Sequence, residues 1–123
     1  MTQLSQEASE VMDQCISDCL ECSEVCFQSI NYCLTKGGRH AEVGHISTLM
    51  DCADICEMSA RWMNRGSGFS GHLCDICSQV CDECAESCEK LSDDEVMQDC
   101  VDVCRRCAES CRNMVNQMQA VLG

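Results

Sequence analysis

Cysteine is the residue type in this sequence with the richest chemistry, because its thiolate is both a soft metal ligand and a redox-active nucleophile. The 123-residue chain has 16 cysteines. The cysteines fall into four groups, and within each group neighbouring cysteines are three or four residues apart, except for one step of seven. The groups are Cys15, Cys19, Cys22, Cys26 and Cys33; Cys52 and Cys56; Cys74, Cys77, Cys81, Cys84 and Cys88; and Cys100, Cys104, Cys107 and Cys111. Steps of three and four place side chains on one face of an α-helix, whereas strands require steps of two. The spacing therefore predicts four helices, each with a cysteine-rich face.

Thiolates on such faces favour a soft ion. Cu(I) fits best, because it prefers sulfur ligands and accepts low coordination numbers. Residues three or four apart on a helix lie within ~5–6 Å between Cβ atoms, so two of their thiolates can reach one ion. If each thiolate also bridges two ions, the load approaches one Cu(I) per cysteine, on the order of 16 per chain. Equal numbers of thiolates and Cu(I) ions leave a buried core nearly neutral, and loading should release thiol protons.

Other roles for the cysteines stay open. Pairs on different helices could combine into four-cysteine sites for Zn(II) or Cd(II), although structural zinc usually lies where loops wrap the ion. A thiol redox function or a disulfide-linked helical structure is a second alternative, but Cys-x2-Cys pairs inside helices lack the N-terminal dipole that lowers a thiol pKa. Iron–sulfur clusters usually take their cysteines from loops. A purely apolar role would suit one or two buried cysteines better than 16.

The breaks between the cysteine groups predict where the helices end. Gly37-Gly38 can end the first helix through a left-handed residue, and residues 92–95 read as a capping box that opens the fourth. Charged residues such as Asp18, Glu21 and Arg106 lie off the cysteine stripes, which are therefore the buried faces. We expect helices over about 4–35, 42–64, 71–90 and 93–120, in one domain spanning residues 1–123. Short connections make this an all-α, antiparallel up-down-up-down four-helix bundle with a cysteine-lined core.

Antiparallel packing also predicts which cysteines meet across the core. Three levels follow from the register: Cys19, Cys56, Cys77 and Cys107; then Cys22, Cys52, Cys81 and Cys104; then Cys26, Leu49, Cys84 and Cys100. Because a helix rises about 1.5 Å per residue, the first stripe alone is ~27 Å long. The bundle interior is thus expected to be a tube lined with sulfur.

Soft ligands are expected at both ends of that tube. One end has Met12, Met63, Met114 and Met118, with His72 close to it; the other has Cys33, His45, Leu91 and Met97, with His40 in the adjacent loop. Candidate residues for copper uptake are His45, His40, Met97, Met12, Met63 and Met114. Methionines at helical spacing are more often core packing than ligands, and His40 and His72 are expected to be exposed at loop ends.

Composition narrows the function classes. Leu, Ile, Val and Phe provide only 23 of 123 residues, so the cysteines must fill the core. The net charge of −13 disfavours binding to nucleic acid or anionic membranes, and no apolar run approaches the roughly 18 residues of a membrane span. Residues 1–10 show no secretory signal, so a cytosolic location is expected, where many cysteines indicate metal or redox work. The sequence has no catalytic constellation, so we do not expect an enzyme.

A second apolar line lies beside the cysteines of the first helix. It consists of Ile16, Leu20, Phe27, Ile30 and Leu34. This line either widens the edge of the core or forms an interface between subunits.

The cysteine motifs resemble those of the copper storage proteins. Cys-x3-Cys-x2-Cys-x3-Cys occurs over residues 15–26 and again over 100–111, and residues 74–88 contain a related run. The resemblance covers nearly the whole chain, although the second helix has only Cys52 and Cys56. It implies a cytosolic homotetramer of four-helix bundles that fill their cores with Cu(I), with His or Met residues near an open end guiding copper. A copper chaperone is a candidate delivery partner.

Overall fold

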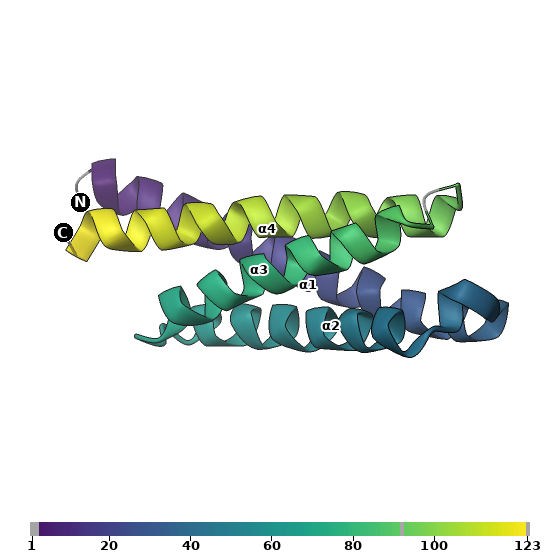
Figure 1. Ribbon diagram of the computed structural model, residues 1–123. Coiled ribbons are helices and arrows are strands. Elements are labelled where there is room, and N and C mark those ends of the chain that lie inside the picture. The colour runs from purple at the N-terminus through teal and green to yellow at the C-terminus, as the bar shows by residue number, and fades with distance from the viewer. Residues whose placement is uncertain (1–2, 92, 123) are drawn as a thin grey trace.

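Four long helices form the molecule. The computed structural model describes residues 3–91 and 93–122 and, within them, contains helices and no strand. The helices are α1 (Gln3–Lys36), α2 (Val43–Asn64), α3 (Ser70–Glu89) and α4 (Glu95–Leu122), with a short 3₁₀ helix, η1 (Gly38–Ala41), between α1 and α2. Each helix packs against two others, α1 and α3 both lying against α2 and α4. The predicted all-α four-helix bundle is confirmed (Figure 1).

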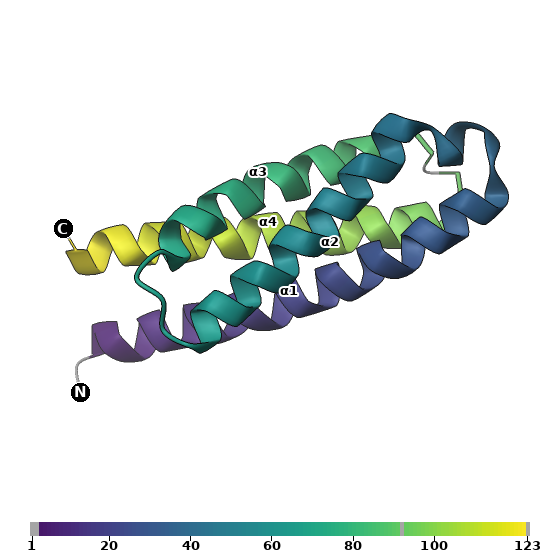
Figure 2. The ribbon, with the colours of Figure 1, turned by 90° about the horizontal axis from the view of Figure 1, so that it is seen from below.

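The helices alternate in direction, which gives the bundle two different ends. Figure 2 shows the two chain termini and the α2–α3 connection at one end, and the α1–α2 and α3–α4 connections at the other. The first is called the methionine end, after Met63 and Met114. The second is called the histidine end, after His45. Among the described residues, none of the helices has an apolar stretch long enough to cross a membrane.

Local chemistry sets the helix ends. Gly37 and Gly38 have φ of 74° and 59°, the left-handed region that glycine adopts without strain, and they end α1 as predicted. The start of α4 differs from the prediction. Asp94 Oδ1 accepts hydrogen bonds from the backbone N–H groups of Val96 (2.9 Å) and Met97 (3.4 Å), so α4 begins at Glu95 rather than at residue 93. Ser92 of the predicted capping box lies outside the described residues.

Cysteine is the most frequent residue of the core. All 16 cysteines are fully buried and belong to one cluster that runs along the bundle. Cysteine packs there as a small apolar side chain, which compensates for the shortage of Leu, Ile and Val. One polar residue departs from the expected pattern, because Asp18 is buried between α1 and α4, where it accepts hydrogen bonds from Ser110 and Gln14. Glu21 stays on the surface and pairs with Arg106 of α4.

Candidate metal centre

The sulfur atoms meet across the core in the predicted register. At the first level, Cys107 Sγ lies 3.6 Å from Cys19 Sγ and 3.8 Å from Cys56 Sγ. Cys77 Sγ completes this level at 3.7 Å from Cys56 Sγ. Four helices therefore bring one thiol each to a single level.

The next two levels repeat the arrangement. Cys22 Sγ lies 3.9 Å from Cys52 Sγ and 3.8 Å from Cys104 Sγ, and Cys52 Sγ is 3.8 Å from Cys81 Sγ. At the third level, Cys26 Sγ lies 4.0 Å from Cys84 Sγ and 3.9 Å from Cys100 Sγ, and the buried Leu49 occupies the position of α2.

Short separations also join one level to the next. Cys56 Sγ is 3.5 Å from Cys81 Sγ, and Cys26 Sγ is 3.7 Å from Cys104 Sγ. Cysteines four residues apart on one helix are similarly close, as with Cys52 and Cys56 at 4.0 Å. The thiols thus form a continuous network along the tube and not a series of separate clusters.

The network offers overlapping ligand sets. Groups whose sulfur atoms all lie within 4.8 Å of one another include Cys19-Cys77-Cys107-Cys111, Cys56-Cys77-Cys81-Cys107, Cys22-Cys52-Cys56-Cys81, Cys22-Cys26-Cys52-Cys104 and Cys26-Cys84-Cys100-Cys104. A metal–thiolate bond of about 2.3 Å places two ligands of one ion about 3.8–4.0 Å apart in tetrahedral or trigonal geometry. The observed separations of 3.5–4.0 Å fit such sets. Because most of these cysteines belong to two groups, their thiolates are placed to bridge ions.

The remaining cysteines extend the tube toward its two ends. Cys15 Sγ lies 3.7 Å from Cys111 Sγ and 4.0 Å from Cys19 Sγ, near the methionine end. Cys88 is buried on α3, where hydrogen bonding to Cys100 and Cys84 raises the pKa of its thiol.

Burial makes the outermost thiol, Cys33, harder to ionise. Desolvation, with smaller contributions from the nearby Cys100 and Asp94, raises the pKa of Cys33 from 9.0 to about 11. Cys33 is a neutral thiol at neutral pH and has to lose its proton to become a thiolate ligand, so metal binding at this end exchanges a proton for a cation.

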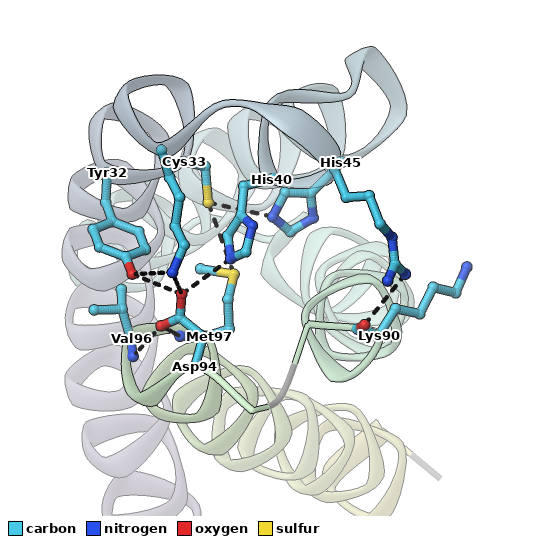
Figure 3. Close-up of polar contacts among 10 residues, drawn as sticks. Tyr32, Cys33, His40, His45, Lys90, Asp94, Val96 and Met97 are labelled. Atoms are coloured by element: carbon cyan, nitrogen blue, oxygen red, sulfur yellow. Dashed lines mark hydrogen bonds and ion pairs between the residues drawn. The ribbon is translucent and has the colours of Figure 1, made fainter.

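At the histidine end, Cys33 meets two other soft ligands. Its Sγ atom lies 3.4 Å from His45 Nε2 and 3.8 Å from Met97 Sδ, as Figure 3 shows. His45 and Met97 are buried, and His45 Nδ1 is 2.7 Å from Ser87 Oγ. Burial lowers the pKa of His45, which favours the neutral imidazole that binds metals. One nitrogen, one thiol and one thioether therefore converge where the cysteine tube ends.

His40 differs from the expectation of an exposed loop residue. Its side chain is only 13% exposed, and its Nε2 lies 3.0 Å from Asp94 Oδ2. The same oxygen accepts a hydrogen bond from Tyr32 Oη at 2.6 Å (Figure 3). It also accepts one from Lys36 Nζ at 3.0 Å. These four residues are called the Asp94 knot. The knot joins the end of α1, η1 and the start of α4.

Hydrogen bonds keep the Asp94 carboxylate of the knot ionised. Burial alone would raise the pKa of Asp94, but hydrogen bonds from Tyr32, Lys36 and the N–H groups that it caps hold that pKa well below its ordinary value. Asp94 is therefore ionised at neutral pH, and its partners are held on it by charge-assisted bonds. His40 is thereby directed to Asp94 in this structure.

The methionine end has a different ligand set. Met63 is buried, with its Sδ 3.8 Å from Cys74 Sγ, and Met114 is buried nearby. Met12 and Met118 are partly buried against the same core. A Cβ atom at Gly71 would lie 2.9 Å from Met118 Sδ, so α3 approaches this thioether closely. His72 is exposed on the first turn of α3, as expected.

Sequence reasoning missed two groups at the histidine end. Ser87 lies beside the cysteine stripe of α3 and has no motif that would distinguish it from the surface serines. Asp94 was identified only as part of a capping box, and its contacts with Tyr32 and Lys36 depend on tertiary packing. Antiparallel packing of α1 and α4 places this cap beside the end of α1, and that register could have predicted the contacts of Asp94.

The cysteine pattern, the buried thiols and their register match one protein family. The copper storage protein family matches residues 8–116, which is most of the chain. The chain belongs to the copper storage protein family. Among curated proteins, an uncharacterised cysteine-rich protein of Bacillus subtilis is 33% identical over 68 residues. That match covers 55% of this chain and 63% of the length of the relative.

Solved copper storage proteins and a related structure have the same bundle. A protein of Nitrosospira multiformis is 40% identical, with a TM-score of 0.83 over 88% of this chain and 97% of its own. The Cu(I)-bound copper storage protein BsCsp3 is 32% identical, with a TM-score of 0.80 over 85% and 98% of the two chains. A cytosolic copper storage protein of Streptomyces lividans, in a structure with five coppers, is 27% identical, with a TM-score of 0.80 over 90% and 97%.

Proposed function

We propose that this chain stores many Cu(I) ions inside its bundle, with the core cysteines as ligands. The observation that supports this best is the overlap between neighbouring four-cysteine groups, because shared thiolates bridge ions and raise the number of ions per chain. The ligands are Cys15, Cys19, Cys22, Cys26, Cys33, Cys52, Cys56, Cys74, Cys77, Cys81, Cys84, Cys88, Cys100, Cys104, Cys107 and Cys111, all within one domain. The load is on the order of one Cu(I) per cysteine.

Copper fits this core better than the alternatives. Zn(II) requires four ligands in each closed tetrahedral site, so 16 thiolates hold fewer Zn(II) ions than Cu(I) ions, which accept lower coordination numbers. Disulfides would remove ligands in pairs, whereas all 16 cysteines are free thiols. Solved relatives include one loaded with 10 copper equivalents. The role is storage in the cytosol, as described for the relative from Streptomyces lividans, and not catalysis.

Copper passes through the histidine end. His45 and Met97 are the uptake residues there, because both touch Cys33, the last thiol of the tube. His40 takes no direct part, since the Asp94 knot holds it. Met12, Met63 and Met114 pack the opposite end and contribute at most a secondary thioether site. A copper chaperone is a candidate to deliver the ion.

The chain forms a homo-oligomer, a tetramer by family resemblance. Three large apolar side chains on α1 support this, because Leu20, Phe27 and Leu34 are 48%, 69% and 54% exposed. Isolated exposed apolar residues are ordinary, but three along one helix suit burial against a second copy. Sedimentation of the wild-type chain beside Phe27→Asp tests this: an assembly that the variant disrupts supports the interface, and a wild-type monomer refutes it.

Anaerobic titration of the reduced protein tests the storage proposal. Cu(I) is added against a competing chelator while free thiols are counted in parallel, and Zn(II) is titrated in the same way. We expect saturation on the order of 16 Cu(I) per chain, with all 16 thiols free beforehand. Saturation at one or two ions would refute storage. Fewer free thiols in protein purified from the cytosol would favour disulfides, and tighter or equal loading with Zn(II) would favour a general thiolate sink.

A further inference from the structure

Ser87 of α3 and Cys33 of α1 contact the two nitrogen atoms of the His45 imidazole. Ser87 Oγ lies 2.7 Å from Nδ1, and Cys33 Sγ lies 3.4 Å from Nε2. His45 is only 6% exposed, so both contacts are made inside the bundle. We propose that Ser87 is a positioning residue that makes Nε2 of His45 the nitrogen that receives copper. The proposal rests on the proposed storage function, in which copper passes through the histidine end, and adds the group that orients the ligand there.

The two nitrogens of a neutral imidazole are not equivalent. One has a proton and donates a hydrogen bond, whereas the other has the lone pair that binds a metal ion. A copper ion shared between His45 and Cys33 needs the lone pair on Nε2, because Nε2 is the nitrogen that faces Cys33 Sγ. The ring proton is then on Nδ1. The Nδ1–H group donates to Ser87 Oγ, which lies at hydrogen-bond distance.

The Ser87 hydroxyl gives this buried N–H group its acceptor. Among the described residues, Ser87 Oγ is the group that lies in hydrogen-bond contact with His45 Nδ1. A buried donor without a partner is costly, so removal of the hydroxyl disfavours the form of the ring that has a free Nε2 lone pair. The ring can then also turn about its Cβ–Cγ bond, which places a carbon atom where Nε2 faces Cys33. Ser87 therefore sets both the tautomer and the direction of the imidazole.

The position of Ser87 on α3 suits this role. It lies between Cys84 and Cys88, which are both fully buried, so the packing of α3 holds its backbone beside the copper core. Ser87 and His45 also line a groove of about 290 Å³ between the first turns of α2 and the last turns of α3. The exposed Glu86 belongs to the same lining, so the groove reaches the protein surface. A fixed hydroxyl keeps Nδ1 from exchanging partners with solvent there, and it adds no charge beside the incoming cation.

Loading rates of matched variants test the role of the hydroxyl. Ser87→Ala removes it, and Ser87→Thr keeps it. Ser78→Ala removes another buried hydroxyl of α3, which donates a hydrogen bond to the carbonyl oxygen of Asp75 at 2.7 Å. Each reduced protein is mixed anaerobically with the Cu(I) complex of bicinchoninate, and the loss of the complex is followed by stopped-flow absorbance. We expect Ser87→Ala to load about tenfold more slowly than the wild type, and the other two variants to stay within about twofold of it.

The same substitution in a chain without the imidazole separates positioning from a general structural effect. Because Ser87 acts through His45, Ser87→Ala should change the loading rate of the His45→Leu variant by less than about twofold. Equal slowing by Ser87→Ala in both backgrounds would overturn the proposal. A wild-type loading rate in Ser87→Ala would overturn it too, as would slowing in Ser87→Thr or Ser78→Ala that matches Ser87→Ala.

Nuclear magnetic resonance identifies the protonated nitrogen directly. Reduced protein labelled with ¹⁵N in its histidines is loaded to capacity with Cu(I), which is diamagnetic, and two-bond ¹H–¹⁵N correlations assign the ring proton of His45. We expect the proton on Nδ1 in the wild type and a mixture of ring states in Ser87→Ala. A proton on Nε2 in the wild type would overturn the proposal without recourse to any variant. A wild-type capacity of one or two ions would instead refute the storage function, so the two failures are distinguishable.

Discussion

The two ends of this bundle close the same sulfur tube with different chemistry. At the histidine end, Cys33 meets an imidazole nitrogen and a thioether, and a groove approaches the imidazole from the side. At the methionine end, Cys74 meets the thioether of Met63, with further methionines packed over it. A nitrogen ligand therefore reaches the last thiol at the histidine end, whereas the soft ligand beside Cys74 at the methionine end is a thioether.

The difference shows how the two ends of a uniform cysteine core become chemically distinct. Every level of the tube offers similar thiols, so nothing in the cysteine pattern alone distinguishes one end as the place of uptake. The distinction comes from His45 and from the polar side chains around it. Thioethers at the other end fill space with flexible apolar groups.

The largest expected effect comes from removing the imidazole. His45→Leu should slow copper loading and removal by about 10- to 100-fold, because the ion loses its ligand next to Cys33. Met63→Leu is the matched change at the methionine end and should leave both rates within about twofold, since Leu and Met have similar volume. Stopped-flow exchange with a Cu(I) chelator measures both. Equal slowing in the two variants would contradict the claim that the two ends differ in copper exchange.

The Asp94 knot should matter for stability and not for loading. Asp94→Ala loses the helix cap and the anion of the knot, at a cost of about 2–3 kcal/mol. Asp94→Asn keeps a good cap and loses only the charge, at a cost of about 1 kcal/mol. Urea unfolding of the reduced proteins separates the two contributions. Identical losses of unfolding free energy in the Ala and Asn variants would show that the helix cap contributes nothing. Wild-type stability in both variants would contradict a stabilising role for the Asp94 knot.

Alkaline pH should weaken the reduced, metal-free protein at the histidine end. Folding raises the pKa of Cys33 from 9.0 to about 11, so its neutral form contributes stability that is complete below pH 9. That contribution is lost as the pH rises from 9 toward 11, by about 1.4 kcal/mol per pH unit for this thiol. Urea midpoints at several pH values measure the slope. Cys33→Ala should have a shallower slope, and an unchanged slope in that variant would contradict the assignment.

The smallest effect is expected where α3 meets Met118. A Cβ atom at Gly71 would lie 2.9 Å from Met118 Sδ and 3.2 Å from its Cε, but both atoms are at the far end of a flexible side chain. Alanine also gains up to about 1 kcal/mol over glycine inside a helix. Gly71→Ala should therefore change the free energy of unfolding by less than about 1 kcal/mol. A loss of several kcal/mol in thermal unfolding would mean that the methionine plug is rigid.

The fold and the core were predictable because one residue type repeats with helical spacing. Steps of three and four fix both the helices and their buried faces, and antiparallel packing then sets the levels that Cys19, Cys22 and Cys26 share with the other helices. The observed sulfur separations confirm that register. The same logic placed Cys33, His45 and Met97 at one end.

The details of the ends were not predictable in the same way. His40 was expected in solvent, but the ionised Asp94 that caps α4 binds it. Asp18 lies off the cysteine stripe and is nevertheless buried, because Ser110 of α4 satisfies it. Ser87 lies beside His45 because α3 packs against α2. Such contacts depend on how side chains of different helices meet, and the spacing of residues in the sequence does not indicate them.

The most direct test of the central claim is to locate the copper itself. Crystals of the reduced chain, loaded anaerobically with an excess of Cu(I), would be measured on both sides of the copper absorption edge. We expect anomalous peaks along the whole tube, between the sulfur atoms of neighbouring cysteine levels, with a further peak among Cys33, His45 and Met97. Peaks confined to surface carboxylates or histidines, with an empty sulfur core, would contradict storage in the bundle interior.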